Sequence, residues 1–484
     1  MKRTRFSRFR LVRTALVAVL LLGFATLSVG ANGSVVPPAV KVALEPGESL
    51  LVEKEVTTPA IPPVVDIVLV EDETGSFWDD ISNLQALAPT LVTALDGSGS
   101  DYATGVVGFR DFAQDPWGDP GDWVYKLYSD VIPGGASLVA GVALLTASGG
   151  NDGPEAQLEA LHYLATPGHA AIDSNGDGDT ADANDTPMGQ QPTWRANAQR
   201  VVLLATDAPC HITGDAGGWP GDAGTTSAAV TAAILDAAGI TVIGLVPNGA
   251  GTNACVDALA AGTGGSVHAT TASGATIVQA ILAGLAELTT DVWWTAVVDP
   301  GLLVTLAPAV HYDVPGATTV VFDETITVPN GTDPGMYCAT VTFWANEYPE
   351  AGAVIATEEI CITVIPIPVD IDIKPWSDPN SINTKSNGVV PVAILGSASF
   401  DVTTVDASTL NFGPDGAGPG HDLTDLDVLA DHYEDANGDG YMDLVSHYRQ
   451  KDIGLVVGDT QACLRGDLLD GRAFEGCDAV RVLK

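Results

Sequence analysis

Carboxylate and hydroxyl side chains gather where one apolar segment ends. Residues 64–70 read VVDIVLV, and EDETGS follows directly. Asp72, Thr74 and Ser76 alternate with other residues, so a loop after a buried strand can turn their oxygens to one side. Such an all-oxygen set suits Mg²⁺, Mn²⁺ or Ca²⁺. A polar turn without a metal is the alternative, because this short pattern alone is not specific.

Two further loops are expected to bring oxygen ligands close to those of the first loop. The segment RVVLLATDAPCHITGD puts Asp207 at the end of a second predicted strand, and GGNDGPEAQLEAL puts Glu155 at the start of a predicted helix. The carboxyl ends of neighbouring parallel strands meet at one sheet edge, where ligands bind in such folds. Alternatively, Asp152 could cap the helix and Glu155 could interact with its dipole.

The three loops together resemble a von Willebrand A-type domain, and most of all the I-like domain of integrin β subunits. The pattern that carries the resemblance is DETGS, GPEA and ATDA, with SFWDDI after the first loop and PTWRANAQRVVLLATDAPCHITGD around the third. It covers about residues 64–288. The resemblance implies a metal-ion-dependent adhesion site in which a ligand carboxylate completes the coordination of the cation.

This resemblance assigns the ligands of two adjoining cations. A Mg²⁺ (or Mn²⁺) site would use Asp72, Thr74, Ser76, Glu155 and Asp207, and a neighbouring Ca²⁺ site would use Asp79 and Asp80 with the Ser76 carbonyl. The third metal site of the family is not carried over, because Asp111 and Asp115 are displaced from its pattern. The paired cysteines of the family's ligand-specificity loop are also missing, so the ligand stays unidentified.

Two other segments resemble calcium loops, in which Asp or Asn at alternate positions precedes a glycine. DANGDGYMD offers Asp435, Asn437, Asp439 and Asp443, and DSNGDGDTADAND offers Asp173, Asn175, Asp177 and Asp179. Neither has the Glu that ends an EF-hand loop. Each could instead be a solvated, Asx-rich turn.

The elements that must position these residues are strands alternating with helices. VVDIVLV, ATGVVGF, RVVLLAT and ITVIGLV are expected strands, and the Ala/Leu-rich segments between them are expected helices. Short apolar strands alternating with helices favour a parallel sheet covered on both faces. We therefore expect an α/β doubly wound, Rossmann-like domain at 64–288.

The remaining segments are rich in strand residues and turns. Residues 289–366 predict a β-sandwich, hybrid- or Ig-like, and residues 32–63 have the same texture and could complete it, with the α/β domain inserted. Residues 367–484 predict a β-rich C-terminal domain that contains the DANGDGYMD loop.

The N-terminus and the charge indicate an exported protein. Residues 1–31 have a basic leader, an apolar run and a small-residue end, as in a cleaved signal peptide; a retained anchor is the alternative. The chain has 20 Lys and Arg against 61 Asp and Glu. Nucleic acid and anionic membrane surfaces are poor partners for this charge, and no further membrane span is expected in the mature chain.

The cysteines suggest three disulfides, and the sequence contains no recognised catalytic motif. Each expected domain contains one pair, which suggests the bridges Cys210–Cys255, Cys338–Cys361 and Cys463–Cys477, although six cysteines allow about 15 pairings. The eight histidines are scattered and form no recognised motif. We expect no enzyme but a secreted or cell-surface protein that binds a protein ligand with an exposed carboxylate. The alternative is a calcium-stabilised component of a surface layer or matrix.

Overall fold

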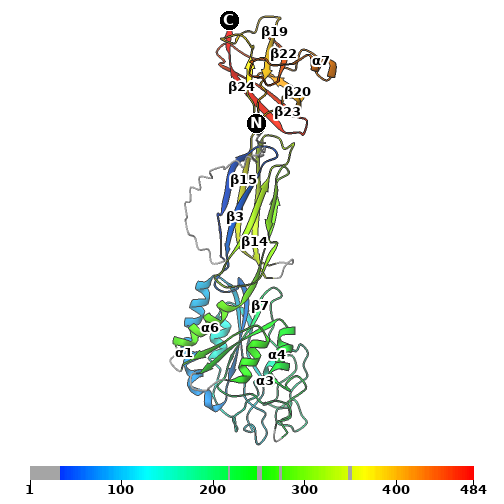
Figure 1. Cartoon of the computed structure of the whole chain (residues 1–484). Helices are drawn as coiled ribbons and strands as arrows, with labels where there is room; N and C mark the ends of the chain where they lie inside the picture. Colours follow the sequence, from blue (N-terminus) through cyan, green and yellow to red (C-terminus); the bar gives the residue numbers. More distant parts are fainter. Residues whose placement is uncertain (1–32, 216–217, 248–252, 272–274, 347–351, 484) are drawn as a thin grey trace, which may run out of the picture.

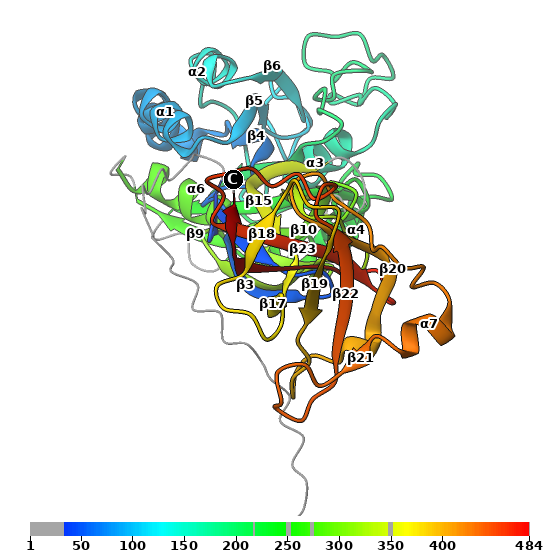
Figure 2. The same cartoon turned by 90° about the horizontal axis from the view of Figure 1, so that it is seen from above.

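The structure is a computed structural model that describes residues 33–215, 218–247, 253–271, 275–346 and 352–483. The expected signal peptide lies outside these ranges. Three parts follow one another along a long axis: an α/β part at one end, two β-sheets in the middle and a C-terminal β part at the other end (Figure 1). Seen from above, the three parts overlap at the centre of the view, while the α/β part and the C-terminal part extend to different sides (Figure 2).

The α/β part contains a six-stranded sheet in the order β6-β5-β4-β7-β8-β9. Five strands are parallel, and β6, a strand that the sequence did not predict, is an antiparallel edge strand. The bounds are β4 Val64–Asp72, β5 Asp101–Phe109, β6 Lys126–Pro133, β7 Gln199–Ala205, β8 Ile240–Pro247 and β9 Val267–Thr270. After β5 and β6 the chain returns to the other side of β4, so the strand order reverses between β4 and β7, where ligands bind in open α/β sheets.

Helices cover both faces of this sheet. One core contains side chains of α1 (Trp78–Ser98), α2 (Ala136–Val142) and α6 (Ala275–Glu287), and the other contains side chains of α3 (Gln157–Ala165), α4 (Ala228–Ala237) and α5 (Ala254–Gly262). Along β4, Ile67 and Leu69 belong to the first core, whereas Val68 and Val70 belong to the second. This alternation explains why the strand sequence is almost entirely apolar from Val64 to Val70, with Asp66 as the exception.

The middle part consists of two sheets around one apolar core. Their orders are β1-β3-β13-β11 and β12-β10-β14-β15-β2. The bounds are β1 Ser34–Val36, β2 Ala39–Leu44, β3 Ser49–Thr57, β10 Thr289–Val298, β11 Leu303–Ala307, β12 Val310–Pro315, β13 Thr319–Thr327, β14 Gly335–Ala345 and β15 Ala353–Val364. Strand β3 pairs with β13, and β2 pairs with β15. The chain therefore runs through both sheets before and after the α/β part.

A buried ion cluster joins these two sheets. The Lys54 ammonium on β3 lies 3.3 Å from Glu324 Oε2 on β13 and contacts the Glu358 carboxylate on β15 of the other sheet. All three side chains are fully buried. Breaking such a cluster by removing one partner is costly, because it leaves an uncompensated charge in the core.

The C-terminal part has its own apolar core between two four-stranded sheets, β16-β24-β23-β20 and β17-β19-β22-β21. A short pair, β18 with β25, lies beside them. The bounds are β16 Ile367–Pro368, β17 Ile371–Ile373, β18 Ser381–Asn383, β19 Val389–Ile394, β20 Val405–Phe412, α7 Leu426–Ala430, β21 Tyr433–Glu434, β22 Asp443–Arg449, β23 Gln461–Leu468, β24 Ala473–Ala479 and β25 Arg481–Leu483. Among the described residues, no helix is long and apolar enough to cross a membrane.

Candidate metal centre

The centre is built on the carboxyl ends of the adjacent strands β4 and β7. Asp72 is the last residue of β4 and is fully buried. Its Oδ1 accepts hydrogen bonds from the Thr74 amide (2.9 Å) and hydroxyl (2.7 Å), and its Oδ2 accepts one from the Thr206 hydroxyl (2.7 Å). Burial raises the pKa of Asp72 to about 6, and the hydrogen bonds from Thr74 and Thr206 oppose this rise.

The first and third loops meet through two hydroxyls. The exposed Ser76 hydroxyl donates to Asp207 Oδ1 (3.1 Å), and the Thr74 and Ser76 hydroxyl oxygens are 3.5 Å apart. Together with the bond between Thr206 and Asp72, these contacts place the oxygens of all four predicted first- and third-loop ligands in one cluster, because parallel pairing of β4 with β7 aligns their ends.

The second loop enters this cluster by close backbone contacts. The Gly75 amide donates to the Gly149 carbonyl (3.0 Å), and the Glu155 amide donates to the Pro209 carbonyl (2.9 Å). At Gly150 φ is +69°, and a Cβ there would lie 3.0 Å from Thr74 Cβ and 3.3 Å from Glu155 Oε1. Glycine is thus required both for the left-handed backbone and for the close approach.

Asp152 plays a different part from the one that the alternative assigned it. The N-cap of α3 is Ala156, without a side-chain cap bond, so Asp152 does not cap this helix. Instead Asp152 Oδ1 lies 3.3 Å from His211 Nε2, while His211 Nδ1 lies 3.2 Å from Asp215 Oδ2. The His211 ring is stacked on Trp219. Its buried position between two carboxylates indicates that His211 fastens the third loop.

The carboxylates of the centre include one that the sequence did not assign. Asp111, two residues beyond β5, is fully buried and faces the Glu155 carboxyl group. With both groups ionised, no described donor bonds to either Asp111 oxygen or to Glu155 Oε2. Burial, followed by the charges of Asp111 and Asp72, raises the pKa of Glu155 well above its usual range. Buried carboxylate oxygens without donors are costly unless a cation neutralises them. This donor set therefore fits a hard divalent cation.

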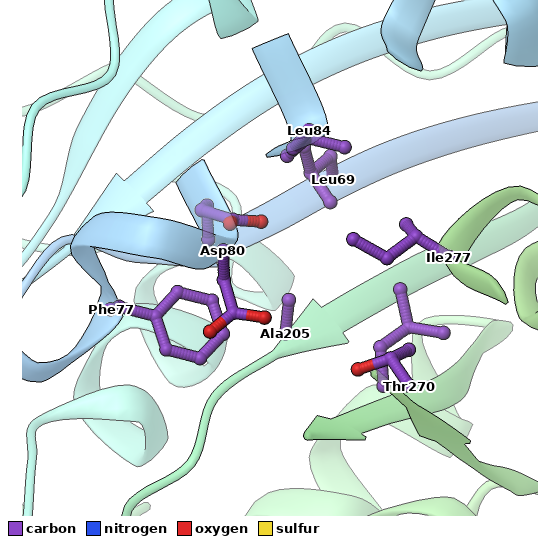
Figure 3. A pocket seen from close by; sticks show the side chains of 9 residues that line it. Leu69, Phe77, Asp80, Leu84, Ala205, Thr270 and Ile277 are labelled. Carbon is purple, nitrogen blue, oxygen red and sulfur yellow. The ribbon is translucent and has the colours of Figure 1, made fainter. Parts of the chain in front are cut away.

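Asp79 and Asp80, the predicted calcium ligands, lie in the first turn of α1. Asp79 is partly exposed, whereas Asp80 is buried and lines a small cavity with Glu71, Leu84 and Ile277 (Figure 3). Burial, followed by the charges of Asp79 and Asp207, raises the pKa of Asp80 to about 6. The sequence indicated no role for Glu71, whose pKa is also raised by burial and by neighbouring carboxylates.

The two expected calcium loops share one hydrogen-bond pattern. In the loop after α3, Asp173 accepts from the amides of Gly176 and Gly178, Asn175 from Asp177, Asp177 from Asp179, and Asp179 from Ala181. The C-terminal loop repeats this pattern: Asp435 accepts from Gly438 and Gly440, Asn437 from Asp439, and Asp439 from Tyr441. Asp443 is buried, and its two oxygens accept from the amides of Gly396 and Ala436. It therefore ties the loop to the end of β19.

All three expected disulfides are present. The Cys210–Cys255 disulfide joins the third loop to α5. The backbone of Cys210 also pairs with that of Glu155 in an isolated β-bridge. The Ala208 carbonyl in the same loop accepts from the Gln157 and Asn253 side chains. The disulfide, the β-bridge and these hydrogen bonds hold the second and third loops against α3 and α5.

No protein-family model and no curated protein matches this sequence. Among the solved structures similar to it, two have von Willebrand factor type A names. One from Catenulispora acidiphila has 15% identity, covers 67% of this chain and 71% of its own, and gives a TM-score of 0.31. The function proposed below rests on the geometry of the site and not on these similarities.

Two further structures match over about half of their own length. The pilus adhesin SpaC from Lactobacillus rhamnosus GG has 12% identity over 90% of this chain and 55% of its own, with a TM-score of 0.32. The proximal thread matrix protein 1 of the mussel byssus, described with a zinc-occupied MIDAS motif, has 16% identity over 49% and 50%, with a TM-score of 0.29.

Proposed function

We propose that this chain is an exported binding protein in which a divalent cation at the end of β4 coordinates an acidic group of a protein ligand. One observation carries the proposal. Three loops from distant parts of the sequence bring buried carboxylates and hydroxyls together, and Asp111 and Glu155 retain oxygens without donors. Such a set gains stability from a bound cation, and no comparable gain comes from a structural turn.

Each residue has a distinct role in this proposal. Asp72, Thr74, Ser76 and Asp207 would hold the cation, and Glu155 would act from the second loop, with Asp111 behind it. The cation, Mg²⁺ or Mn²⁺, would supply an open coordination position for a ligand carboxylate. Ser76 is exposed, so this position faces solvent. In the finer, integrin-like form of the proposal, Asp79 and Asp80 hold a neighbouring Ca²⁺.

The shape of the molecule supports a binding role. Strand β4 begins where the chain leaves the middle sheets, so its carboxyl end lies toward the far end of the α/β part (Figure 1). A ligand site at that end of a long molecule is accessible to another protein. Three disulfides suit an extracellular location. We propose binding without catalysis, because the Ser76 hydroxyl bonds to the Asp207 carboxylate and, among the described residues, to no histidine or lysine.

Mn²⁺ serves as the probe in the test. We expect the full chain to bind Mn²⁺ in electron paramagnetic resonance titrations, and Asp72→Asn to abolish one site while circular dichroism is unchanged. Asp236→Asn, on the exposed face of α4, is the matched control. Acetate should lower the water-proton relaxivity of the bound Mn²⁺, since it displaces water from an open position. Equal titrations for the wild type and Asp72→Asn would refute the proposal.

A structural role is the second candidate, favoured by the identical hydrogen-bond pattern of the two acidic loops. In a calcium-stabilised component of a surface layer or matrix, Ca²⁺ in the Asp173 and Asp435 loops would stabilise the assembled chain. Asp72→Asn would then change neither stability nor assembly, whereas Asp435→Asn would lower both. The two variants therefore separate the two functions.

A further inference from the structure

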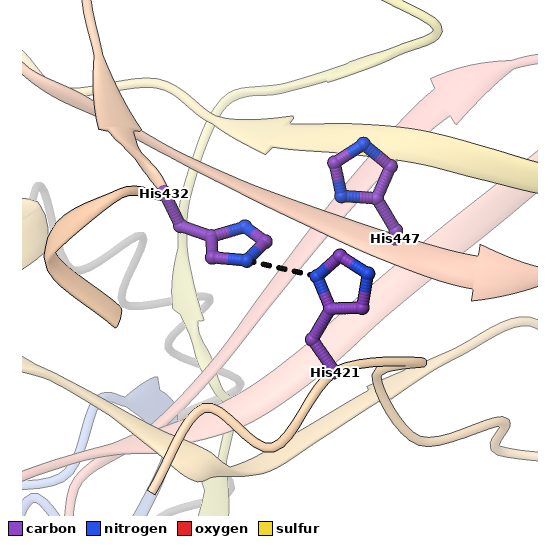
Figure 4. Close-up of side chains that lie close together, drawn as sticks. All are labelled: His421, His432 and His447. Carbon is purple, nitrogen blue, oxygen red and sulfur yellow. Dashed lines mark hydrogen bonds between the residues drawn. The ribbon is translucent and has the colours of Figure 1, made fainter. Parts of the chain in front are cut away.

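Three of the eight histidines, scattered in the sequence, meet in the C-terminal part. His421 precedes α7, His432 follows it, and His447 lies on β22. One nitrogen of each ring lies within 4.8 Å of the corresponding nitrogens of the other two (Figure 4). None of these residues belongs to the centre in the α/β part, so a separate explanation is required.

The backbone holds each histidine in place. The Gly420 amide donates to the His447 carbonyl (2.6 Å), which fixes the segment before α7 against β22 beside His421. The Val445 amide donates to the His432 carbonyl (2.9 Å). The cluster is therefore held by main-chain bonds to one strand, and only the His421 side chain is exposed.

The hydrogen bonds of the rings leave lone pairs directed into the cluster. His432 Nδ1 lies 2.5 Å from the Val445 carbonyl oxygen, which can only accept, so Nδ1 carries the proton and Nε2 has the lone pair that a cation would bind in place of the bond from His421. A bond from the second ring nitrogen to a backbone carbonyl is common among metal-binding histidines. His432 Nε2 lies 3.1 Å from His421 Nδ1.

The third ring contributes a buried nitrogen without a partner. His447 Nδ1 has no hydrogen bond among the described residues, and it faces the other two rings (Figure 4). Burial, followed by the neighbouring His432 and His421, lowers the pKa of His447. In a tetrahedral site with Zn–N distances of about 2.0–2.1 Å, the nitrogens lie about 3.3 Å apart. Here the His421 and His432 nitrogens are 3.1 Å apart, and all three ligand nitrogens lie within 4.8 Å of one another.

We propose that His421, His432 and His447 form a binding site for a borderline divalent cation, Zn²⁺ or Cu²⁺, with a fourth position open to solvent beside His421. Imidazole favours these cations, whereas the oxygen-rich centre of the α/β part favours Mg²⁺, Mn²⁺ or Ca²⁺. The two sites would thus take different metals at opposite ends of the molecule.

Cu²⁺ and Zn²⁺ are the probes in the test, with the full chain carrying Asp72→Asn to remove binding at the first centre. We expect nitrogen hyperfine structure in the Cu²⁺ resonance spectrum and one Zn²⁺ bound per chain by calorimetry. His421→Ala and His447→Gln should each weaken Zn²⁺ binding by about 100-fold or more, since loss of even an outer partner of a ligand costs about 10–100-fold.

His169→Ala is the matched control, because His169 lies near His162 and Asp222 in a second cluster, in the α/β part. It should leave Zn²⁺ affinity and the nitrogen signal unchanged. The proposal is overturned if the chain binds no Zn²⁺, if His421→Ala and His447→Gln bind it as the parent does, or if the signal is lost in His169→Ala instead. Circular dichroism of each variant excludes unfolding as the cause of any loss.

Discussion

At the scale of single residues, the hydroxyl of Thr206 positions the main carboxylate. It is buried and donates to Asp72 Oδ2 (2.7 Å), while the Ala208 amide donates to Thr206 (3.1 Å). Thr206→Val keeps the volume of the side chain and removes this bond. We expect Mn²⁺ affinity to fall by about 10–100-fold, as when other outer partners of metal ligands are lost. Titration of Thr93→Val, an exposed hydroxyl on α1, should match the wild type.

Gly150 offers a second test at this scale. Gly150→Ala would place a methyl group against Thr74 and force a left-handed alanine, at a cost of about 1–2 kcal/mol. We expect weaker Mn²⁺ binding, because Thr74 and Glu155 must move apart. Gly153→Ala, where a Cβ meets no atom within 4 Å, is the control. Equal Mn²⁺ affinities of the two variants would show that the second loop does not shape the centre.

At the scale of elements, the Cys210–Cys255 bridge connects the third loop to α5. Replacing both cysteines with serine should lower the free energy of unfolding by about 2–4 kcal/mol. It should also weaken Mn²⁺ binding, because Glu155 pairs with Cys210. The same double replacement at Cys338 and Cys361, in the middle sheets, should reduce stability without changing Mn²⁺ affinity. Denaturation and titration of both variants distinguish these effects, and unchanged Mn²⁺ affinity in the first would contradict the account.

The buried cluster of Lys54 gives a pH prediction for the middle sheets. Burial, and then the charge of Glu324, raises the pKa of Glu358 from 4.5 to about 7. The folded chain therefore holds a proton that the unfolded chain has lost, so the free energy of unfolding should fall as the pH rises from about 4.5 to 7 and then level off. Urea denaturation across this range measures the slope. In Glu358→Gln the part of the pH slope that is due to Glu358 should vanish. An unchanged slope in this variant would contradict the prediction.

Much of the α/β part could be predicted because its strands have a distinctive sequence. The apolar segment VVDIVLV leads into Asp72, the last residue of its strand, and parallel strands place their carboxyl ends together, so Asp72 and Asp207 could be paired in advance. Strand β6 was missed because its half-buried residues show no continuous apolar run. A strand at the exposed edge of a sheet has a less apolar sequence than a central strand, so it is harder to predict.

The remaining site residues could not be predicted from the sequence, because long-range contacts bring them together. Asp111 follows β5 closely, yet nothing local indicates that it is fully buried near Glu155, since that depends on how the second loop folds back. The histidines at 421, 432 and 447 show no motif because three separate segments bring them together. The second loop was placed at this sheet edge because Glu155 begins a predicted helix, and the resemblance to a known pattern then made the assignment specific.

At the scale of the whole molecule, the response to chelation distinguishes a binding protein from a calcium-stabilised scaffold. The α/β part and the C-terminal part lie at opposite ends (Figure 1), and the formal net charge is −41. If the function is metal-dependent binding, chelation should remove Mn²⁺ from the first centre while the radius of gyration and most of the thermal stability remain. Small-angle scattering and thermal unfolding in EDTA measure both. A large expansion on chelation would favour the calcium-stabilised scaffold instead.

The most direct test of the central claim is a crystal structure of the full chain grown with saturating Mn²⁺, with anomalous scattering recorded at the manganese edge. We predict one peak bonded to Ser76 and to the carboxylates of the strand ends, Asp72 and Asp207. A parallel crystal in Mg²⁺ should show metal–oxygen distances of about 2.0–2.1 Å there. Full Mn²⁺ saturation without a peak between Asp72 and Ser76 would contradict the account.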